Sequence, residues 1–124
     1  MRFLARQHIR SNADFLRIKG CGQGESLGVF ALRMLIPGCL HQQEEPIKRF
    51  GVVASKRVGI AVKRNRAKRV FREIFRLNQD VLPASCDVVI IAYANFEKCS
   101  FEELQSRYRS GVEKLLKRIN GIKE

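Results

Sequence analysis

A run of basic residues between positions 56 and 72 is the part of this sequence best suited to chemistry. Eight lysines and arginines fall within 17 residues, with no acid among them: Lys56, Arg57, Lys63, Arg64, Arg66, Lys68, Arg69 and Arg72. An arginine can place two N–H groups on phosphate oxygens, and a lysine supplies a point charge. On a merely solvated helix these cations would repel one another. The run therefore predicts a phosphate-binding segment.

The pattern from residue 63 to residue 79 predicts a helix with two distinct faces. At the angular step of an α-helix, one stripe is apolar: Ala67, Val70, Ile74 and Leu77, with Phe71 on its flank. The opposite side gathers four cations and an amide within about 100° of arc: Asn65, Lys68, Arg69, Arg72 and Arg76. Glu73 follows Arg69 by four residues, so these two side chains can pair, although this order is the weaker orientation for such a pair.

The net charge of the chain comes from two segments. Its 124 residues carry 24 Lys and Arg against 12 Asp and Glu, a net charge of +12. Residues 1–19 hold five basic residues against one acid, residues 50–79 hold nine against one, and the remaining charges cancel. Charge that served only solubility would be spread over every exposed face. The concentration indicates a polyanionic partner, more often nucleic acid than an anionic membrane surface.

Residues suited to independent catalysis or metal binding are dispersed. Four cysteines stand singly: Cys21, Cys39, Cys86 and Cys99. Because only His8 and His41 could join them, we expect free thiols and no zinc site. The glycine-rich segment 20–24 is not followed by Lys-Ser/Thr, so it predicts a flexible turn and not a phosphate-binding loop. We predict no catalytic and no metal-ligating residue in the protein.

Shorter patterns predict the elements that must position the basic helix. Residues 12–20 predict a short helix, and residues 27–36 and 50–55 predict two strands paired antiparallel across a loop at 39–48. The apolar run 88–92 predicts a central buried strand, and Ser100 with Glu103 forms a capping box before a last amphipathic helix. This order describes an α+β fold, a small α/β sandwich with helices packed on a mostly antiparallel sheet. We expect one domain over residues 1–124, with residues 1–10 as a flexible basic arm.

Neither a membrane span nor a secretory signal is predicted. No apolar run approaches the roughly 20 residues that cross a bilayer, and the apolar stretch at the start is too short for a signal peptide. We expect a cytoplasmic protein.

Residues 51–76 resemble the "RNR" signature of the bacterial ribonuclease P protein family. Three motifs carry the resemblance in the family's order and spacing: Ser55-Lys56-Arg57, Gly59-x-Ala-Val, and Arg64-Asn65-Arg66-x-Lys68-Arg69-x-x-Arg72-Glu73. Residues 12–15, with Gly22 downstream, resemble the family's first helix and turn. Residues 30–35 and 88–92 match its strands, so the resemblance covers about residues 10–120.

This resemblance implies the protein subunit of a ribonucleoprotein that removes the 5′ leader of precursor tRNA. The RNA subunit would perform the hydrolysis with bound Mg²⁺, and the protein alone would bind no cofactor. The implied partners are the catalytic RNA and precursor tRNA, without a membrane or an obligate protein partner. The implied fold is an α/β sandwich with a left-handed βαβ crossover, an exception to the usual right-handed rule.

The resemblance also implies two binding surfaces. Residues that bind the RNA subunit would be Lys56, Arg57, Lys63, Arg64, Asn65, Arg66, Lys68, Arg69 and Arg72. A cleft between the first helix and the sheet would hold the single-stranded leader, with Phe15 stacking on its bases; the alternative for Phe15 is packing in the core. Basic residues would assist there: Arg17, Lys19 and Arg33. The sequence departs from the family pattern at three places, where Ile60 replaces an asparagine, Arg33 replaces a tyrosine of some relatives, and no second aromatic stands near Lys19.

Two other functions stay open from the sequence. A general structured-RNA-binding or ribosome-associated module would bind unrelated RNAs with similar affinity at physiological salt, where phosphate contacts weaken. A stand-alone nuclease would cleave RNA with a metal and without an RNA subunit, and the dispersed acids argue against it.

Overall fold

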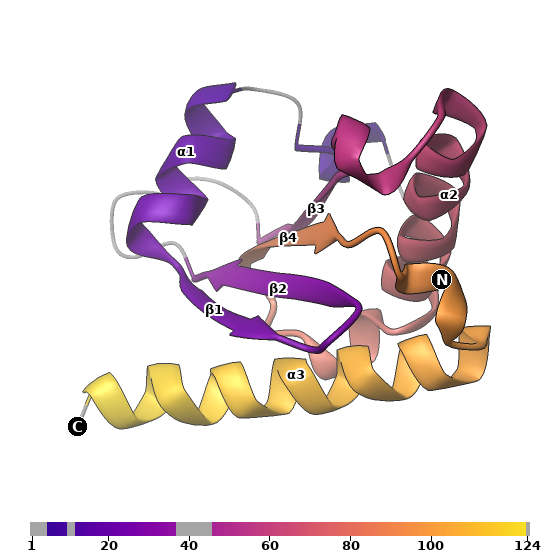
Figure 1. The fold of residues 1–124 in the computed structure, drawn as a ribbon. Coiled ribbons are helices and arrows are strands. Elements are labelled where there is room, and N and C mark those ends of the chain that lie inside the picture. Colours follow the sequence, from indigo (N-terminus) through magenta and orange to yellow (C-terminus); the bar gives the residue numbers. More distant parts are fainter. Residues whose placement is uncertain (1–4, 10–11, 37–45, 124) are drawn as a thin grey trace.

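Four strands form one mixed sheet within the residues that the computed structural model describes, 5–9, 12–36 and 46–123. They are β1 (Gln23–Ser26), β2 (Phe30–Leu35), β3 (Lys48–Val53) and β4 (Cys86–Ala92), in the spatial order β1-β2-β4-β3. The α-helices are α1 (Asn12–Cys21), α2 (Ala61–Leu77) and α3 (Phe101–Lys123), as Figure 1 shows. The expected α+β sandwich with a mostly antiparallel sheet is confirmed.

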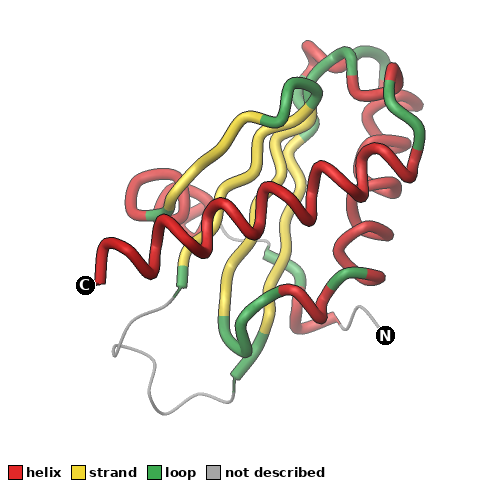
Figure 2. The backbone as a smooth tube through the Cα atoms, turned by 90° about the horizontal axis from the view of Figure 1, so that it is seen from below, coloured by secondary structure: helices red, strands yellow, loops and turns green. Residues whose placement is uncertain are grey.

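The helices cover opposite faces of the sheet. Val88 and Ile90 of β4 belong to the large core formed with α2 and α3, whereas Val89 packs with Ile18 of α1 in a smaller cluster. Figure 2 shows α3 crossing the strands. Because β4 lies between two strands and is covered on both faces, it reads as a continuous apolar run. The predicted central buried strand is therefore confirmed.

The predicted pairing of the strands at 27–36 and 50–55 is wrong. β3 runs antiparallel to β2, but β4 lies between them, and β3 pairs in parallel with β4. Parallel neighbours need a crossover connection, and α2 supplies it. This β3–α2–β4 unit is the crossover whose left-handed sense the family resemblance implies.

An additional strand lies where the sequence predicts only a turn. β1 begins at Gln23, inside the glycine-rich segment, and its polar residues show no apolar alternation. A short edge strand needs no such alternation, because its ladder and its neighbours hold it. β1 pairs with β2 throughout, and Arg118 of α3 donates a hydrogen bond to the Gly24 carbonyl (2.8 Å). Gly28, with a φ of +87°, makes the turn between the two strands.

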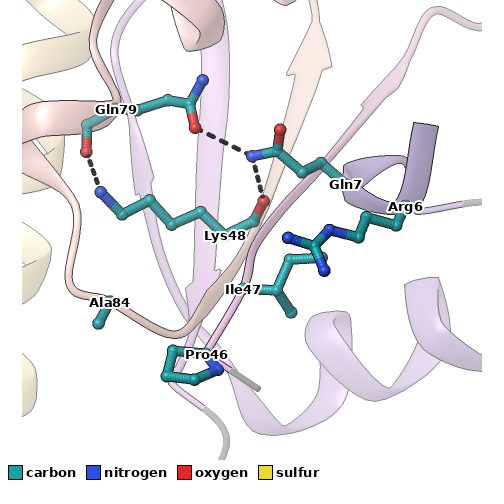
Figure 3. Close-up of a pocket in the computed structure, with 7 residues that line it drawn as sticks. All are labelled: Arg6, Gln7, Pro46, Ile47, Lys48, Gln79 and Ala84. Carbon is teal, nitrogen blue, oxygen red and sulfur yellow. Dashed lines mark hydrogen bonds between the residues drawn. The ribbon is translucent and has the colours of Figure 1, made fainter. Parts of the chain in front are cut away.

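Residues 5–9, part of the segment expected to be a flexible arm, lie against β3. The Ile9 N–H donates to the Phe50 carbonyl (2.9 Å). The Gln7 side-chain amide donates to the Lys48 carbonyl and to the Gln79 side-chain oxygen, both at 2.9 Å (Figure 3). Lys48 Nζ in turn donates to the Gln79 carbonyl (2.6 Å), across a pocket of about 450 Å³. These polar groups bind one another and so attach the segment to the sheet.

The last helix begins as predicted. The Glu103 N–H donates to Ser100 Oγ (3.2 Å), and that hydroxyl donates to Glu103 Oε1 (3.4 Å). Cys86 is buried and Cys99 half-buried, both as free thiols. Cys39 and His41, which the cysteine and histidine prediction also names, fall outside the described residues, as does the side chain of Cys21.

Candidate nucleic-acid interface

A short turn and a glycine position the amino end of α2. The 3₁₀ turn η3 (Lys56–Val58) follows Ser55, whose Oγ accepts a hydrogen bond from the Arg57 N–H (3.3 Å). Gly59 then adopts a φ of +141°, a conformation that favours glycine. Ile60 precedes the helix and supplies no side-chain cap. The first N–H groups of α2 therefore keep their capacity to bind an anion.

The buried face of α2 is turned from the predicted stripe toward its aromatic residues. Ala67 and Ile74 are buried as predicted, but Leu77 is 39% exposed and Val70 is only half-buried. Two aromatic residues are fully buried in their place: Phe71 and Phe75. Phe75 stacks on Phe50 with ring centroids 4.8 Å apart. Large rings bury more apolar area than Leu or Val, so they set the rotation of the helix.

Six predicted RNA-binding cations at and before α2 have no side-chain partner among the described residues: Lys56, Arg57, Arg64, Lys68, Arg69 and Arg72. We call these six side chains the α2 surface. Two further cations are engaged, since Lys63 Nζ donates to the Ala94 carbonyl (3.0 Å) and Arg66 donates to Glu97 Oε2 (2.9 Å). Asn65 is exposed beside them. The structure thus brings the predicted RNA-binding residues together on one element and the turn before it.

The Arg69–Glu73 pair that the spacing allows does not form. Glu73 binds Arg76 instead, three residues along the helix. This hydrogen-bonded pair holds the pKa of the Glu73 carboxyl below its usual range and raises the pKa of Arg76. The acid on this helix is therefore satisfied by an arginine outside the α2 surface, and Arg69 keeps its full charge for a ligand.

A cleft of about 220 Å³ lies between α1 and the opposite face of the sheet. It is lined by Phe15, Leu16, Ile18, Lys19, Arg33, Val53, Val89 and Ile91. We call it the α1 cleft. Leu16 is 69% exposed and Val53 is 38% exposed, so the apolar lining continues to the surface. An apolar floor with a basic rim suits a base and its phosphate better than a phosphate alone.

Phe15 stands over a glycine of the sheet. A Cβ on Gly51 would lie 2.8 Å from two ring carbons of Phe15, closer than van der Waals contact. The ring is half-buried, so one part packs on the sheet while another part lines the α1 cleft. Both readings of Phe15, core packing and cleft wall, therefore describe part of its position.

Arg17, predicted to contact the leader, is part of an ion-pair network beneath α1. Its Nη2 lies 3.1 Å from Asp87 Oδ2 and 3.6 Å from Asp14. Arg49 of β3 donates two hydrogen bonds to Asp87, both at 2.8 Å, and a third to Asp14 (3.2 Å). Asp87 is buried, and its hydrogen bonds raise the pKa of Arg49. The network fastens α1 to β3 and β4.

Sequence reasoning missed Asp87 and Arg49 because the predicted strands began one residue later, at Val88 and Phe50. One signal in the sequence could have found them. Asp87 stands directly before one predicted apolar strand, and Arg49 stands directly before another.

The other two leader predictions differ in their exposure. Arg33 of β2 donates to the carbonyls of Lys19 (2.7 Å) and Gly22 (3.1 Å), so it holds the end of α1. Lys19 is exposed on the lining of the cleft. Within the cleft, Phe15 and Lys19 are thus open to a ligand, whereas Arg17 and Arg33 already bind protein groups.

Acids elsewhere in the described chain do not cluster. In residues 5–9, 12–36 and 46–123, no three His, Cys, Asp or Glu side chains gather in a way that could hold a metal ion. No described helix combines the length and apolar composition needed to cross a membrane.

Comparison of the sequence with known proteins returns one consistent family. The family model for ribonuclease P matches residues 3–119. The "Ribonuclease P protein component" of Desulforapulum autotrophicum is 34% identical over 113 residues, covering 91% of this chain and 88% of the relative. That of Fusobacterium nucleatum is 44% identical over 111 residues, covering 90% and 91%.

Solved structures agree with the sequence relatives. The ribonuclease P protein of Thermotoga maritima superposes with a TM-score of 0.68 at 32% identity, covering 91% of this chain and 97% of that chain. The protein from Staphylococcus aureus gives a TM-score of 0.68 at 26% identity, with coverages of 91% and 94%. Since sequence and fold agree over nearly the whole chain, the chain belongs to the ribonuclease P protein family and has the function of that enzyme's protein subunit.

Proposed function

We propose that this subunit promotes 5′ maturation of tRNA by binding the catalytic RNA through the α2 surface and the leader of precursor tRNA through the α1 cleft. The observation that carries the proposal is the α2 surface itself, six cations that no acid among the described residues neutralises. Family membership favours this role over that of a general RNA-binding or ribosome-associated module.

On the α2 surface, recognition is electrostatic and geometric. Each arginine can fork onto phosphate oxygens, and the uncapped amino end of α2 adds backbone donors. Binding releases counterions from the RNA, so affinity falls with salt in proportion to the phosphates neutralised. Because Phe71 and Phe75 fix α2 to the core, the helix holds the attachment points of its cations at set positions, so the surface favours RNA whose phosphates have a matching spacing.

In the α1 cleft, recognition is suited to a single strand of any sequence. Bases stack on an aromatic ring with about 1–3 kcal/mol each, whatever their identity. Phe15 supplies the ring and Lys19 a nearby charge. Arg17 and Arg33 support this site by holding α1 in place, a positioning role in addition to the electrostatic one predicted from the sequence.

The chemistry of the reaction is assigned to the RNA subunit. Mg²⁺ held mainly by the RNA would activate the attacking water, and the protein would lower the Mg²⁺ requirement by neutralising phosphates nearby. The described acids that lie beside these surfaces, Asp14, Asp87 and Glu97, are each bound to arginine, as suits a protein that binds anions. The setting we propose is the cytoplasm.

Reconstitution with the cognate RNA subunit at low Mg²⁺ tests the proposal. We expect the protein to raise the rate of precursor tRNA cleavage and Arg69→Ala to reduce the effect, with Lys117→Ala as a control because Lys117 pairs with Glu113 on the outer face of α3. The proposal fails if the protein does not change cleavage, or if it binds unrelated structured RNAs equally well at physiological salt.

A further inference from the structure

One acid lies among the predicted RNA-binding cations without belonging to α2. Glu97, in the short turn η5 (Phe96–Lys98) between β4 and α3, accepts the hydrogen bond from Arg66 described above. Both side chains are accessible, with 56% of Arg66 and 37% of Glu97 exposed. A surface that bound only phosphate would gain from having no carboxylate at this place, because the carboxylate repels phosphate oxygens.

A small pocket lies beside this pair. It has a volume of about 200 Å³ and is formed between α2 and the β4–α3 connection. Arg66 and Glu97 contribute its charged part, and Val70, Phe96 and Phe101 contribute apolar walls. Pockets for drug-sized ligands measure roughly 300–1,000 Å³, so this smaller pocket is of a size for one planar ring system.

The pocket is held in shape before any ligand binds. Lys63 of α2 fixes the connection through the Ala94 carbonyl (3.0 Å). The next residue, Asn95, donates to the Gly28 carbonyl (3.4 Å), and the buried Phe96 ring lies 6.1 Å from that of Phe71. A preformed site loses little conformational entropy on binding, so the cost of ordering is low.

We propose that this pocket binds one unpaired nucleobase of the RNA subunit, with Glu97 accepting hydrogen bonds from base N–H groups while Arg66 donates to a base oxygen or nitrogen. Proteins read RNA sequence mostly at unstacked bases through such edge contacts. The Watson–Crick edge of guanine carries N–H donors beside an oxygen acceptor, the complement of a carboxylate beside a guanidinium. The inference rests on the proposed role of α2 in binding the RNA subunit.

The substitution Glu97→Gln distinguishes base recognition from phosphate binding by the sign of its effect. If Glu97 accepts from a base, the variant binds the cognate RNA subunit about tenfold more weakly, the size of one lost bidentate base contact. If Glu97 only withholds Arg66 from a phosphate, the variant binds more tightly and its salt dependence steepens. Glu113→Gln is the matched control, because it changes the net charge equally on the exposed outer face of α3; we expect unchanged affinity.

A second variant changes the shape of the pocket without changing charge. Cys99 lines the pocket from the connection and is half-buried. Cys99→Leu should fill part of the space and weaken binding of the cognate RNA subunit, with an unchanged salt slope and an unchanged melting temperature. A glyoxal reagent that modifies unpaired guanines should show one guanine protected by the wild-type protein and exposed with Glu97→Gln.

Equal or tighter binding by Glu97→Gln, or full affinity of Cys99→Leu, would overturn the nucleobase site. Arg69→Ala measured in parallel separates this failure from a failure of the proposed function. If Arg69→Ala weakens binding while the pocket variants do not, only the nucleobase site is wrong. If Arg69→Ala also has no effect, the assignment of α2 to the RNA subunit is wrong.

Discussion

The α2 surface and the α1 cleft are both basic, but they hold their charge in opposite ways. On the α2 surface, six cations have no protein partner in the described structure. Around the α1 cleft, Arg17, Arg33 and Arg49 are bound to carboxylates or carbonyls of the protein itself. Net charge along a segment therefore does not measure the charge available to a ligand. An arginine that is paired within the protein stabilises the fold, whereas an arginine without a protein partner can still bind a ligand through its N–H groups.

Breaking the ion-pair network under α1 should give the largest loss of folding stability. Asp87→Ala removes a buried carboxylate and leaves Arg49 and Arg17 without their main partner. We expect the free energy of unfolding to fall by about 3 kcal/mol, the lower end for breaking a buried pair because both arginines are partly exposed. Urea denaturation measures this loss.

The matching control is Asp80→Ala, whose exposed carboxylate lies 3.4 Å from Arg109 and should contribute far less to stability than Asp87 does. The Asp87→Ala variant should also affect leader binding. At temperatures where this variant stays folded, we expect normal affinity for the RNA subunit but a smaller difference in affinity between substrates with and without a leader. Normal leader discrimination in this variant would show that the network does not position the cleft.

Removing charge from the α2 surface should weaken RNA binding and leave stability nearly unchanged, the reverse of the result expected for Asp87→Ala. The double variant Arg69→Ala/Arg72→Ala leaves the buried face of α2 intact, so the melting temperature should change little. Its affinity for the RNA subunit should fall by about 3 kcal/mol, from two charge-assisted contacts, and the salt slope should decrease by about 2. A titration of affinity against salt measures both quantities, and an unchanged slope would place the RNA on another face.

A conservative change at the ring of the α1 cleft should have a smaller effect. Phe15→Leu keeps an apolar side chain over Gly51 but removes the stacking surface. We expect KM for a precursor tRNA with a long leader to rise about fivefold, since base stacking on a ring contributes about 1–3 kcal/mol. The control substrate is a precursor with a one-nucleotide leader, whose KM should not change; equal effects on both substrates would assign the ring to packing alone.

Two neighbouring residues of β4 face opposite sides of the sheet and differ in their surroundings. Cys86 belongs to the large core, beside Asp87 on the α1 side. Burial, with a further contribution from the Asp87 charge, raises the pKa of the Cys86 thiol to about 12. The folded protein therefore keeps a proton that the unfolded chain loses near pH 9, so this contribution to stability is complete below pH 9 and is lost as the pH rises toward 12.

We expect a loss of about 1 kcal/mol at pH 10 from this thiol. Cys86→Ala should be less stable at neutral pH because of its cavity, but its free energy of unfolding should decline less steeply between pH 8 and pH 10. Parallel denaturation curves at these pH values test the difference. Identical slopes would mean that the thiol is accessible to water.

Sequence reasoning succeeded where one physical signal dominated. The apolar run of β4, the capping box of α3 and the cationic face of α2 each depend on local periodicity or charge, and each was found in its predicted place. It failed where partners distant in the chain decided. β1 has polar residues and exists through its ladder with β2, and β3 lies beside β4 because the most apolar strand takes the centre. The exact rotation of α2 depended on which rings met Phe50 and Phe30.

The sequence by itself determined that positive charge is concentrated as a polyanionic partner would require, which helix carries the densest charge, and which family the chain resembles. Spacing and charge are properties of the chain alone. Only the tertiary structure decided which of those charges remain available to a ligand. Arg17 is neutralised by Asp87, 70 residues away, while Glu73 binds Arg76 and Arg69 has no side-chain partner in the described part of the chain. The reason is that an ion pair depends on a distance of a few ångströms in space, and only folding fixes that distance.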